Sequence, residues 1–334
     1  MKYHVSTLTG IVMKYRVSTL TGIAMKAFWR NKRYLVTLSA LAAFSSSCSG
    51  TNPLAPLPSL SNAPPTKGEF NFKTVEMPAA QRTVATGINR AGDIVGNYAD
   101  AAGVVHGFLL HGDVFTTFDY PGAVLTDARG IGDNGEIVGT YRLPGEPVVN
   151  VHGFRRSTSG NYVKVDFPGR TNTIAQRILP DGTILGCRHD NDLMATMRGV
   201  VIGGSGQGEI DVFASMHNGG TPDRRRIAGL YTNMTVTPNR GEGYVIDNGV
   251  FTPLLVLGST FTAAWDVNPA GEIAGVYGDA AGPHGFVLTA RGYISVDVPG
   301  ATATRAFGIN AQGNVVGSFI AAGKTSGFLA TPVR

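Results

Sequence analysis

The chain has 334 residues, of which 45 are Gly, 18 are Pro and only 15% are charged. This composition favours many short strands joined by tight turns over a helical protein, and 43% apolar residues can bury a substantial core. The net charge of +5 comes from the first 47 residues, which hold seven basic residues and no acidic one, whereas the remainder has 21 basic and 23 acidic residues. We therefore expect no nucleic-acid partner, because the mature chain offers no broad basic surface for phosphates.

The N-terminal segment predicts export. Residues 1–12 recur almost unchanged as residues 13–24, which indicates a duplicated upstream segment that is not part of the mature protein. Residues 25–47 have the pattern of an export signal peptide: a basic start, an apolar run over residues 34–44, and small residues after it. This run is shorter than the roughly twenty residues that a membrane-spanning helix needs.

Cys48 follows three serines and opens a Pro- and Ser-rich stretch, residues 48–68, with the composition of an extended tether. The junction resembles the lipobox of bacterial lipoproteins, whose first mature residue is a lipidated Cys. This resemblance implies a lipid anchor at Cys48, which would be the protein's contact with a membrane. Ser45 stands where that family usually has Leu, so cleavage by an ordinary signal peptidase and free secretion is the alternative. With Cys48 lipidated, Cys187 lacks a disulfide partner and is expected to be an ordinary strand residue.

Residues 69–334 are built from an internal repeat. Two short patterns recur in phase, and successive copies of the first lie 42 to 46 residues apart. The first pattern, Gly followed by an aromatic or apolar residue, begins at Gly107, Gly153, Gly199, Gly243, Gly285 and Gly327. The second, two apolar residues and then Gly, begins at Ile94, Ile137, Ile184, Ile227, Ile273 and Val315. Such a period is typical of propellers and solenoids.

Each repeat predicts four short antiparallel strands. Alternating segments end in Asp-x-Pro-Gly at Gly122, Gly169 and Gly300, and turns rich in Asn and Gly separate the strands. Four strands per repeat is the size of a propeller blade, so we expect an all-β, six-bladed β-propeller. The chain starts with a fourth strand at Phe70 and ends with a third strand from Ser326, which predicts that both complete one blade and close the ring. An open β-solenoid is the alternative.

The repeat resembles the HAF-type extracellular repeat of bacterial secreted and surface proteins. The residues that carry the resemblance are Gly87-Ile88-Asn89, Ile94-Val95-Gly96, Asp100, His106-Gly107-Phe108 and Asp119-Tyr120-Pro121-Gly122, with looser copies downstream through residue 334. The fourth copy departs most from the pattern. The resemblance implies a location outside the cytoplasm and a repeated β architecture, and it implies no catalytic residues.

The most conspicuous polar residues recur with the repeat. His106, His152 and His284 each precede Gly-Phe, and Asp119, Asp166 and Asp297 each precede x-Pro-Gly. A catalytic centre needs one asymmetric set of groups, whereas a residue present once per blade serves turns and interstrand hydrogen bonds. The alternative is a ring of equivalent sites that reads a repetitive polymer.

Two departures from the repeat are candidate sites. His189, Asp190 and Asp192 replace an ordinary turn and supply nitrogen and oxygen ligands for a divalent cation, the one cofactor that the sequence suggests. The alternative is a solvated polar loop, because the spacing matches no complete EF-hand. Arg224, Arg225 and Arg226 could bind the carboxylates or sulfates of an acidic glycan, the alternative being an exposed edge or loop.

No catalytic motif of the HExxH, GxSxG, Walker A or CxxC kind occurs. We therefore expect an exported, envelope-associated binding or scaffolding module whose partner is a cell-envelope polysaccharide or another protein. One alternative is a glycoside hydrolase or lyase, which requires two carboxylates about 5 to 10 Å apart near the central channel. The other is a purely structural envelope protein.

Overall fold

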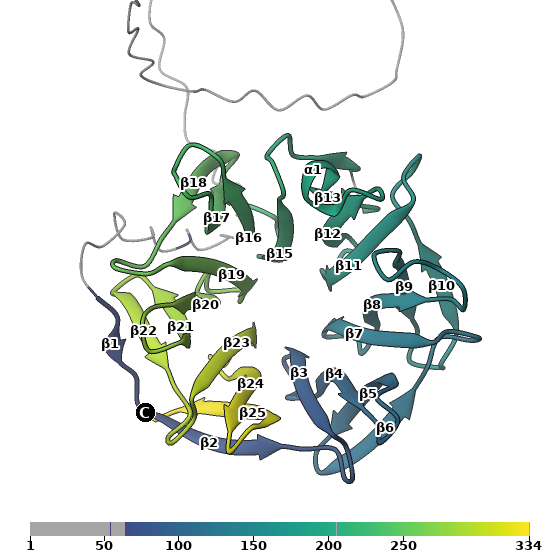
Figure 1. The fold of residues 1–334 in the computed structure, drawn as a ribbon, viewed down its shortest axis with the longest axis horizontal. Coiled ribbons are helices and arrows are strands. Elements are labelled where there is room, and N and C mark those ends of the chain that lie inside the picture. The colour runs from purple at the N-terminus through teal and green to yellow at the C-terminus, as the bar shows by residue number, and fades with distance from the viewer. Residues whose placement is uncertain (1–53, 55–63, 205, 334) are drawn as a thin grey trace, which may run out of the picture. The chain divides into compact units, whose positions relative to one another are not determined.

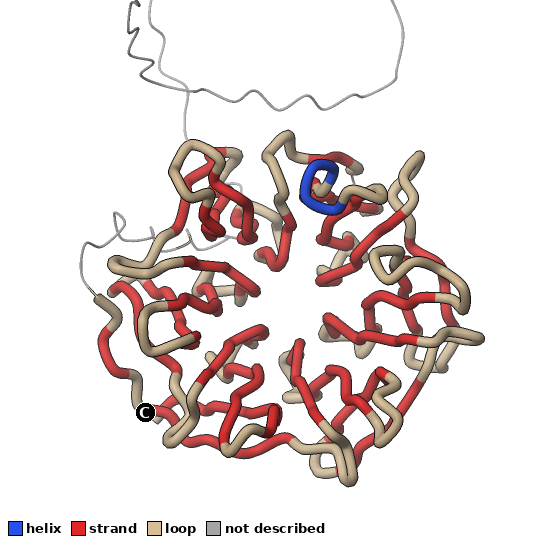
Figure 2. The backbone as a smooth tube through the Cα atoms, viewed as in Figure 1, coloured by secondary structure: helices blue, strands red, loops and turns tan. Residues whose placement is uncertain are grey.

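The computed structural model describes Leu54, residues 64–204 and residues 206–333. The described residues form strands β1 to β25 and one short helix, α1 (Leu193–Thr196), as the colours of Figure 2 show. No helix among them is long and apolar enough to cross a membrane. The export signal, Cys48 and most of the tether lie outside the described residues.

Most strands follow one another in antiparallel groups of four, and these groups lie around a common centre (Figure 1). The first groups are β3 (Arg82–Ile88), β4 (Ile94–Ala99), β5 (Val105–His111) and β6 (Val114–Phe118), then β7 (Leu125–Ile131), β8 (Ile137–Arg142), β9 (His152–Arg156) and β10 (Tyr162–Val165). Next come β11 (Asn172–Ile178), β12 (Ile184–His189), β13 (Arg198–Ile202) and β14 (Gly208–Glu209), then β15 (Met216–Gly220), β16 (Arg226–Asn233), β17 (Arg240–Asp247) and β18 (Val250–Leu254). The prediction of an all-β propeller is confirmed.

The last strands of the chain pair with the first. A further sheet contains β19 (Phe261–Val267), β20 (Ile273–Gly278), β21 (Pro283–Thr289) and β22 (Gly292–Val296), and β1 (Thr66–Lys67) pairs in parallel with β22. The final sheet has the order β2-β25-β24-β23, with β23 (Ala303–Ile309), β24 (Val315–Ala321) and β25 (Lys324–Pro332). In it, β2 (Phe70–Val75) pairs antiparallel with β25 over its whole length, from Phe70 opposite Pro332 to Val75 opposite Gly327.

The two repeated sequence patterns meet inside each sheet. Gly96 of β4 is directly opposite Phe108 of β5, and a Cβ added at Gly96 would lie 2.8 Å from the Phe108 ring. The Gly of the second pattern therefore makes room for the aromatic residue of the first. The same opposition occurs in four further strand pairs, at Gly139 and Phe154, Gly229 and Tyr244, Gly275 and Phe286, and Gly317 and Phe328.

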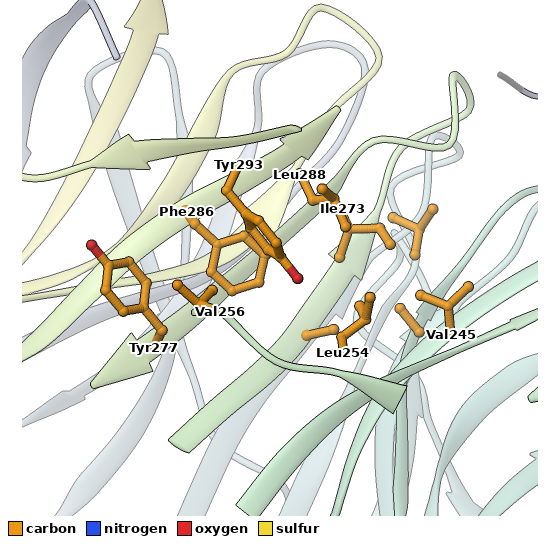
Figure 3. Close-up of a cluster of buried hydrophobic side chains, with 11 residues drawn as sticks. Val245, Leu254, Val256, Ile273, Tyr277, Phe286, Leu288 and Tyr293 are labelled. Carbon is orange, nitrogen blue, oxygen red and sulfur yellow. The ribbon is translucent and has the colours of Figure 1, made fainter. Parts of the chain in front are cut away.

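The core consists of apolar clusters between neighbouring sheets. In one of them, Val245 of β17 and Leu254 of β18 pack with Ile273 of β20 and Phe286 of β21 (Figure 3). Cys187 lies in β12 and is fully buried, as expected for a strand residue, and this burial raises the pKa of its thiol to about 12. A thiol in this environment is unreactive at neutral pH.

Candidate ligand site at the central channel

The three residues expected to bind a cation do not form a ligand set. His189 is buried, its Nδ1 lies 3.0 Å from the Asp190 carbonyl oxygen, and burial lowers its pKa. The Asp190 carboxylate accepts a hydrogen bond from Thr171 Oγ1 at 3.0 Å, and the Asp192 carboxylate caps α1 by accepting from the Ala195 N–H. Among the described residues, no group of three or more His, Cys, Asp or Glu side chains is placed to hold a metal ion.

The three consecutive arginines do not share one surface. Arg226 is buried, and its guanidinium donates hydrogen bonds to the Gly271 carbonyl oxygen at 2.8 Å and to Asp247 Oδ2 at 2.6 Å. Arg225 pairs with Asp223 two residues earlier. Arg226 therefore stabilises the contact between two sheets. The three arginines do not form one solvent-exposed binding surface.

Two of the three recurring His and Asp pairs are hydrogen-bonded, whereas His152 bonds Glu146 and lies 3.7 Å from Asp166. His106 Nδ1 lies 2.8 Å from Asp119 Oδ2, and its ring stacks on Tyr98 with the centroids 5.1 Å apart. Burial alone would lower the pKa of His106, but the hydrogen bond and charge of Asp119, aided by Asp100, raise it above its usual value. In the sheet that contains β21, His284 repeats this arrangement with Asp297 at 3.0 Å. The pair links the third strand of a repeat to the segment after the fourth.

The strands nearest the centre, β3, β7, β11, β15, β19 and β23, each contain a β-bulge (Figure 1). The extra residues at these bulges are Thr86, Arg129, Gln176, Asn218, Trp265 and Phe307. The residue that follows is Gly in four of the strands, but it is Arg177 in β11 and Asp266 in β19. Bulges commonly re-aim side chains beside functional sites.

Arg177 and Asp266 form a buried ion pair at the centre of the ring of strands. Arg177 Nε lies 3.1 Å from Asp266 Oδ1, and both side chains are at most 10% exposed. The Arg177 guanidinium also donates to the carbonyl oxygens of Thr86 at 2.9 Å and of Phe307 and Arg129 at 2.5 Å. Burial raises the pKa of Asp266, although the Arg177 charge and two backbone N–H groups oppose this shift. The pair thus joins the inner strands of several sheets.

Two cavities lie along the inner strands, and Arg177 and Asp266 line the smaller one. The smaller one, about 90 Å³, is lined by the turns that follow the inner strands, including Arg90, Asp133, Pro180, Pro222 and Pro269. The larger one, about 170 Å³, lies at the other end of the same strands. We call it the Trp265 cavity, and its lining residues are Arg82, Val84, Thr86, Asn97, Asp127, Arg129, Gln176, Trp265 and Phe307.

The lining of the Trp265 cavity combines aromatic and polar side chains. The rings of Trp265 and Phe307 are in edge-to-face contact, with their centroids 5.2 Å apart. The polar residues of the lining bond to one another: Arg129 Nη2 lies 2.7 Å from Asp127 Oδ2, and Arg129 Nη1 donates to Gln176 Oε1 at 3.2 Å. Ligand pockets typically combine an apolar or aromatic wall with a few fixed polar groups.

A second polar chain reaches Asp127 from the first inner strand. Asn97 donates from Nδ2 to Asp127 Oδ1 at 2.8 Å, and Arg82 donates from Nη1 to Asn97 Oδ1 at 3.0 Å. Asp127 is the only carboxylate among the nine lining residues. The pair of convergent carboxylates that a glycoside hydrolase needs is therefore not found in this cavity.

None of the residues of the Trp265 cavity was among the sites expected from the sequence. The signal that could have found them is variation at one repeat position: the residue before the bulge is Ala in five of the six inner strands, whereas the extra residue differs in all six. A position that varies between otherwise similar repeats, beside a position that does not, is not needed for the packing that the repeats share. Its side chains are therefore candidates for ligand binding.

Comparison with known proteins gives the fold and no more. No family model matches the chain, and no curated protein matches it. Among solved structures, a putative TolB from Agrobacterium tumefaciens is 14% identical, with a TM-score of 0.50 over 76% of this chain and 80% of the other. The β-propeller domain of the Trilobed protease from Pyrococcus furiosus is 12% identical, with a TM-score of 0.45 over 76% and 84% of the two chains. The fold of this chain is thus similar to that of the putative TolB.

Proposed function

We propose that this protein is an exported, envelope-associated binding module that holds its ligand in the Trp265 cavity. The observation that carries the proposal is the composition of that cavity: two aromatic rings, two guanidinium groups, one carboxylate and two amides around about 170 Å³ at the end of the inner strands. Export is supported by the signal-like residues 25–47, by the lipobox-like junction at Cys48 and by the resemblance to HAF-type repeats.

We further propose that the ring has six blades and is closed. In support, β3–β6 and β7–β10 share one sheet only through a single parallel bridge between Val105 and Leu125, so each can be counted as a blade of its own. The pairing of β2 with β25 supports closure, because it supplies the last group with a fourth strand. A closed ring keeps the inner strands in fixed positions, which preorganises the cavity that they line.

The binding proposal is tested with polysaccharide extracted from the cell envelope and the full-length protein. Affinity electrophoresis through gels with and without this polysaccharide should show retardation of the wild-type protein. Trp265→Ala should weaken the retardation at least about tenfold, because a buried aromatic anchor commonly supplies a large share of the binding free energy. Leu257→Ala, which truncates an exposed apolar side chain elsewhere, is the control and should bind like the wild type. Equal retardation of all three proteins would overturn the proposed site.

A further inference from the structure

The charges of the Trp265 cavity do not cancel. Its lining contains two guanidinium groups, Arg82 and Arg129, and one carboxylate, Asp127. Asp127 pairs with Arg129 and also accepts from Asn97. No carboxylate of the described residues lies within ion-pair distance of Arg82, whose guanidinium donates to an amide oxygen instead. The cavity therefore carries an excess positive charge that favours an anion.

Arg129, which lines this cavity, also has one guanidinium nitrogen without an acceptor in the described part of the chain. Nε of Arg129 is inaccessible to solvent and has no hydrogen-bond partner among the described residues. Leaving a buried donor unsatisfied is costly, so such groups in folded proteins usually have a partner. Guanidinium groups bind carboxylates through paired, charge-assisted hydrogen bonds, which makes a carboxylate a suitable partner for this pair of arginines.

The aromatic residues and the volume of the cavity indicate the size and type of the uncharged part of the ligand. Trp265 and Phe307 present ring surface to the space, and a volume of about 170 Å³ is close to that of the ~150 Å³ cavity known to hold one six-membered ring. The amides of Asn97 and Gln176 and the carboxylate of Asp127 provide donors and acceptors for hydroxyl groups. A flat aromatic acid would leave these groups unused.

We infer that the Trp265 cavity binds an acidic sugar unit, a hexuronate, with its carboxylate at Arg82 and Arg129 and its ring against Trp265. This inference rests on the proposed function and names the ligand class of the same site. The hydroxyl groups of the sugar then bond Asn97, Asp127 and Gln176, which line the cavity beside the arginines. Binding the sugar in this way requires no chemical step.

The test is isothermal titration of the full-length protein with three sugars of equal ring size: glucuronate, its uncharged amide glucuronamide, and glucose. The wild-type protein should bind glucuronate at least about tenfold more tightly than either neutral sugar, because only glucuronate brings a negative charge to the two guanidinium groups. Arg82→Gln should weaken glucuronate binding and reduce this preference, because Arg82 is the guanidinium of the cavity that donates to an amide and not to a carboxylate. Arg90→Gln, an arginine beside the cavity at the opposite end of the inner strands, should keep the preference.

Each result has a distinct meaning. Equal affinity for all three sugars, lost in Trp265→Ala, would overturn the acidic class and leave the proposed binding site intact. Glucuronate binding that survives Arg82→Gln unchanged, or no binding of any of the three sugars, would also overturn the inference. The comparison of glucuronate with glucuronamide uses only the wild-type protein, so it tests the preference for an acidic sugar even if Arg82→Gln fails to fold.

Discussion

Arg177 and Asp266 occupy a position that is Gly in the other four inner strands. At those strands the Gly is packed tightly against the neighbouring one: a Cβ added at Gly130 would lie 2.7 Å from the Gln176 carbonyl oxygen. The Arg177 and Asp266 side chains at this level form an ion pair and neutralise each other's charge. The sequence contains both substitutions, but their pairing could not be predicted, because it depends on which strands face each other across the centre.

The ion pair at the centre should be a major source of stability. Arg177→Met leaves the Asp266 charge buried without a partner and removes the donors to several carbonyl oxygens, so the free energy of unfolding should fall by about 3–5 kcal/mol. Arg155→Met breaks a more exposed pair with Glu136 and should cost less than about 1 kcal/mol. Denaturant unfolding measures both, and an equal effect of the two substitutions would contradict this role of Arg177.

His106 should make stability depend on pH. Its pKa is raised in the folded protein, so its pairing with Asp119 stabilises the fold fully below its unfolded pKa of about 6.5 and is lost as the pH rises through the folded pKa. The difference in melting temperature between wild type and His106→Gln should therefore be larger at acidic than at alkaline pH. Melting curves between about pH 5.5 and 8 measure this difference, which would be constant if the side chain stayed neutral throughout.

At the scale of strands, the repeat could be predicted from the sequence because residues at a fixed spacing along the chain also pack against each other. The opposition of Gly96 and Phe108 follows from two patterns at a fixed spacing, so alternation and turn residues were sufficient to predict the strands. The binding-site residues could not be predicted in this way. Arg226 has the sequence context of an exposed turn, yet it is buried, because Asp247 and the Gly271 carbonyl oxygen come from other strands and turns. Contacts between sheets leave no local signal in the chain.

The Gly of the second pattern should tolerate no side chain. In Gly96→Ala the new methyl group collides with the Val84 carbonyl oxygen and lies 2.8 Å from the Phe108 ring, so the unfolding free energy should fall by about 1–3 kcal/mol. Gly208→Ala adds a methyl group with no atom within 4 Å and is the matched control. Thermal unfolding compares the two variants. A stable Gly96→Ala protein would mean that the sheet can shift to accept the methyl group.

At the scale of the whole repeat domain, the proposed closure depends on a strand from the opposite end of the sequence. Deleting residues 48–76 removes β2, together with the two-residue strand β1, and leaves β25 with an unpaired edge, which favours aggregation and lowers the melting temperature. Deleting residues 48–63 leaves every described strand in place and should have little effect. Light scattering during thermal melting compares the two deletions. Identical behaviour would show that β2 is dispensable and that the ring is stable without this pairing.

The central claim, that a ligand occupies the Trp265 cavity, is tested most directly by the fluorescence of Trp265 itself. The chain has two Trp residues, and the other, Trp29, lies within the predicted export signal, so the processed protein reports from this cavity alone. Titration with envelope polysaccharide should give a saturable change in emission that Arg90→Gln retains and that Phe307→Ala, which removes the neighbouring ring, weakens. Binding detected by titration calorimetry without any change in Trp265 emission would place the ligand elsewhere and contradict the account.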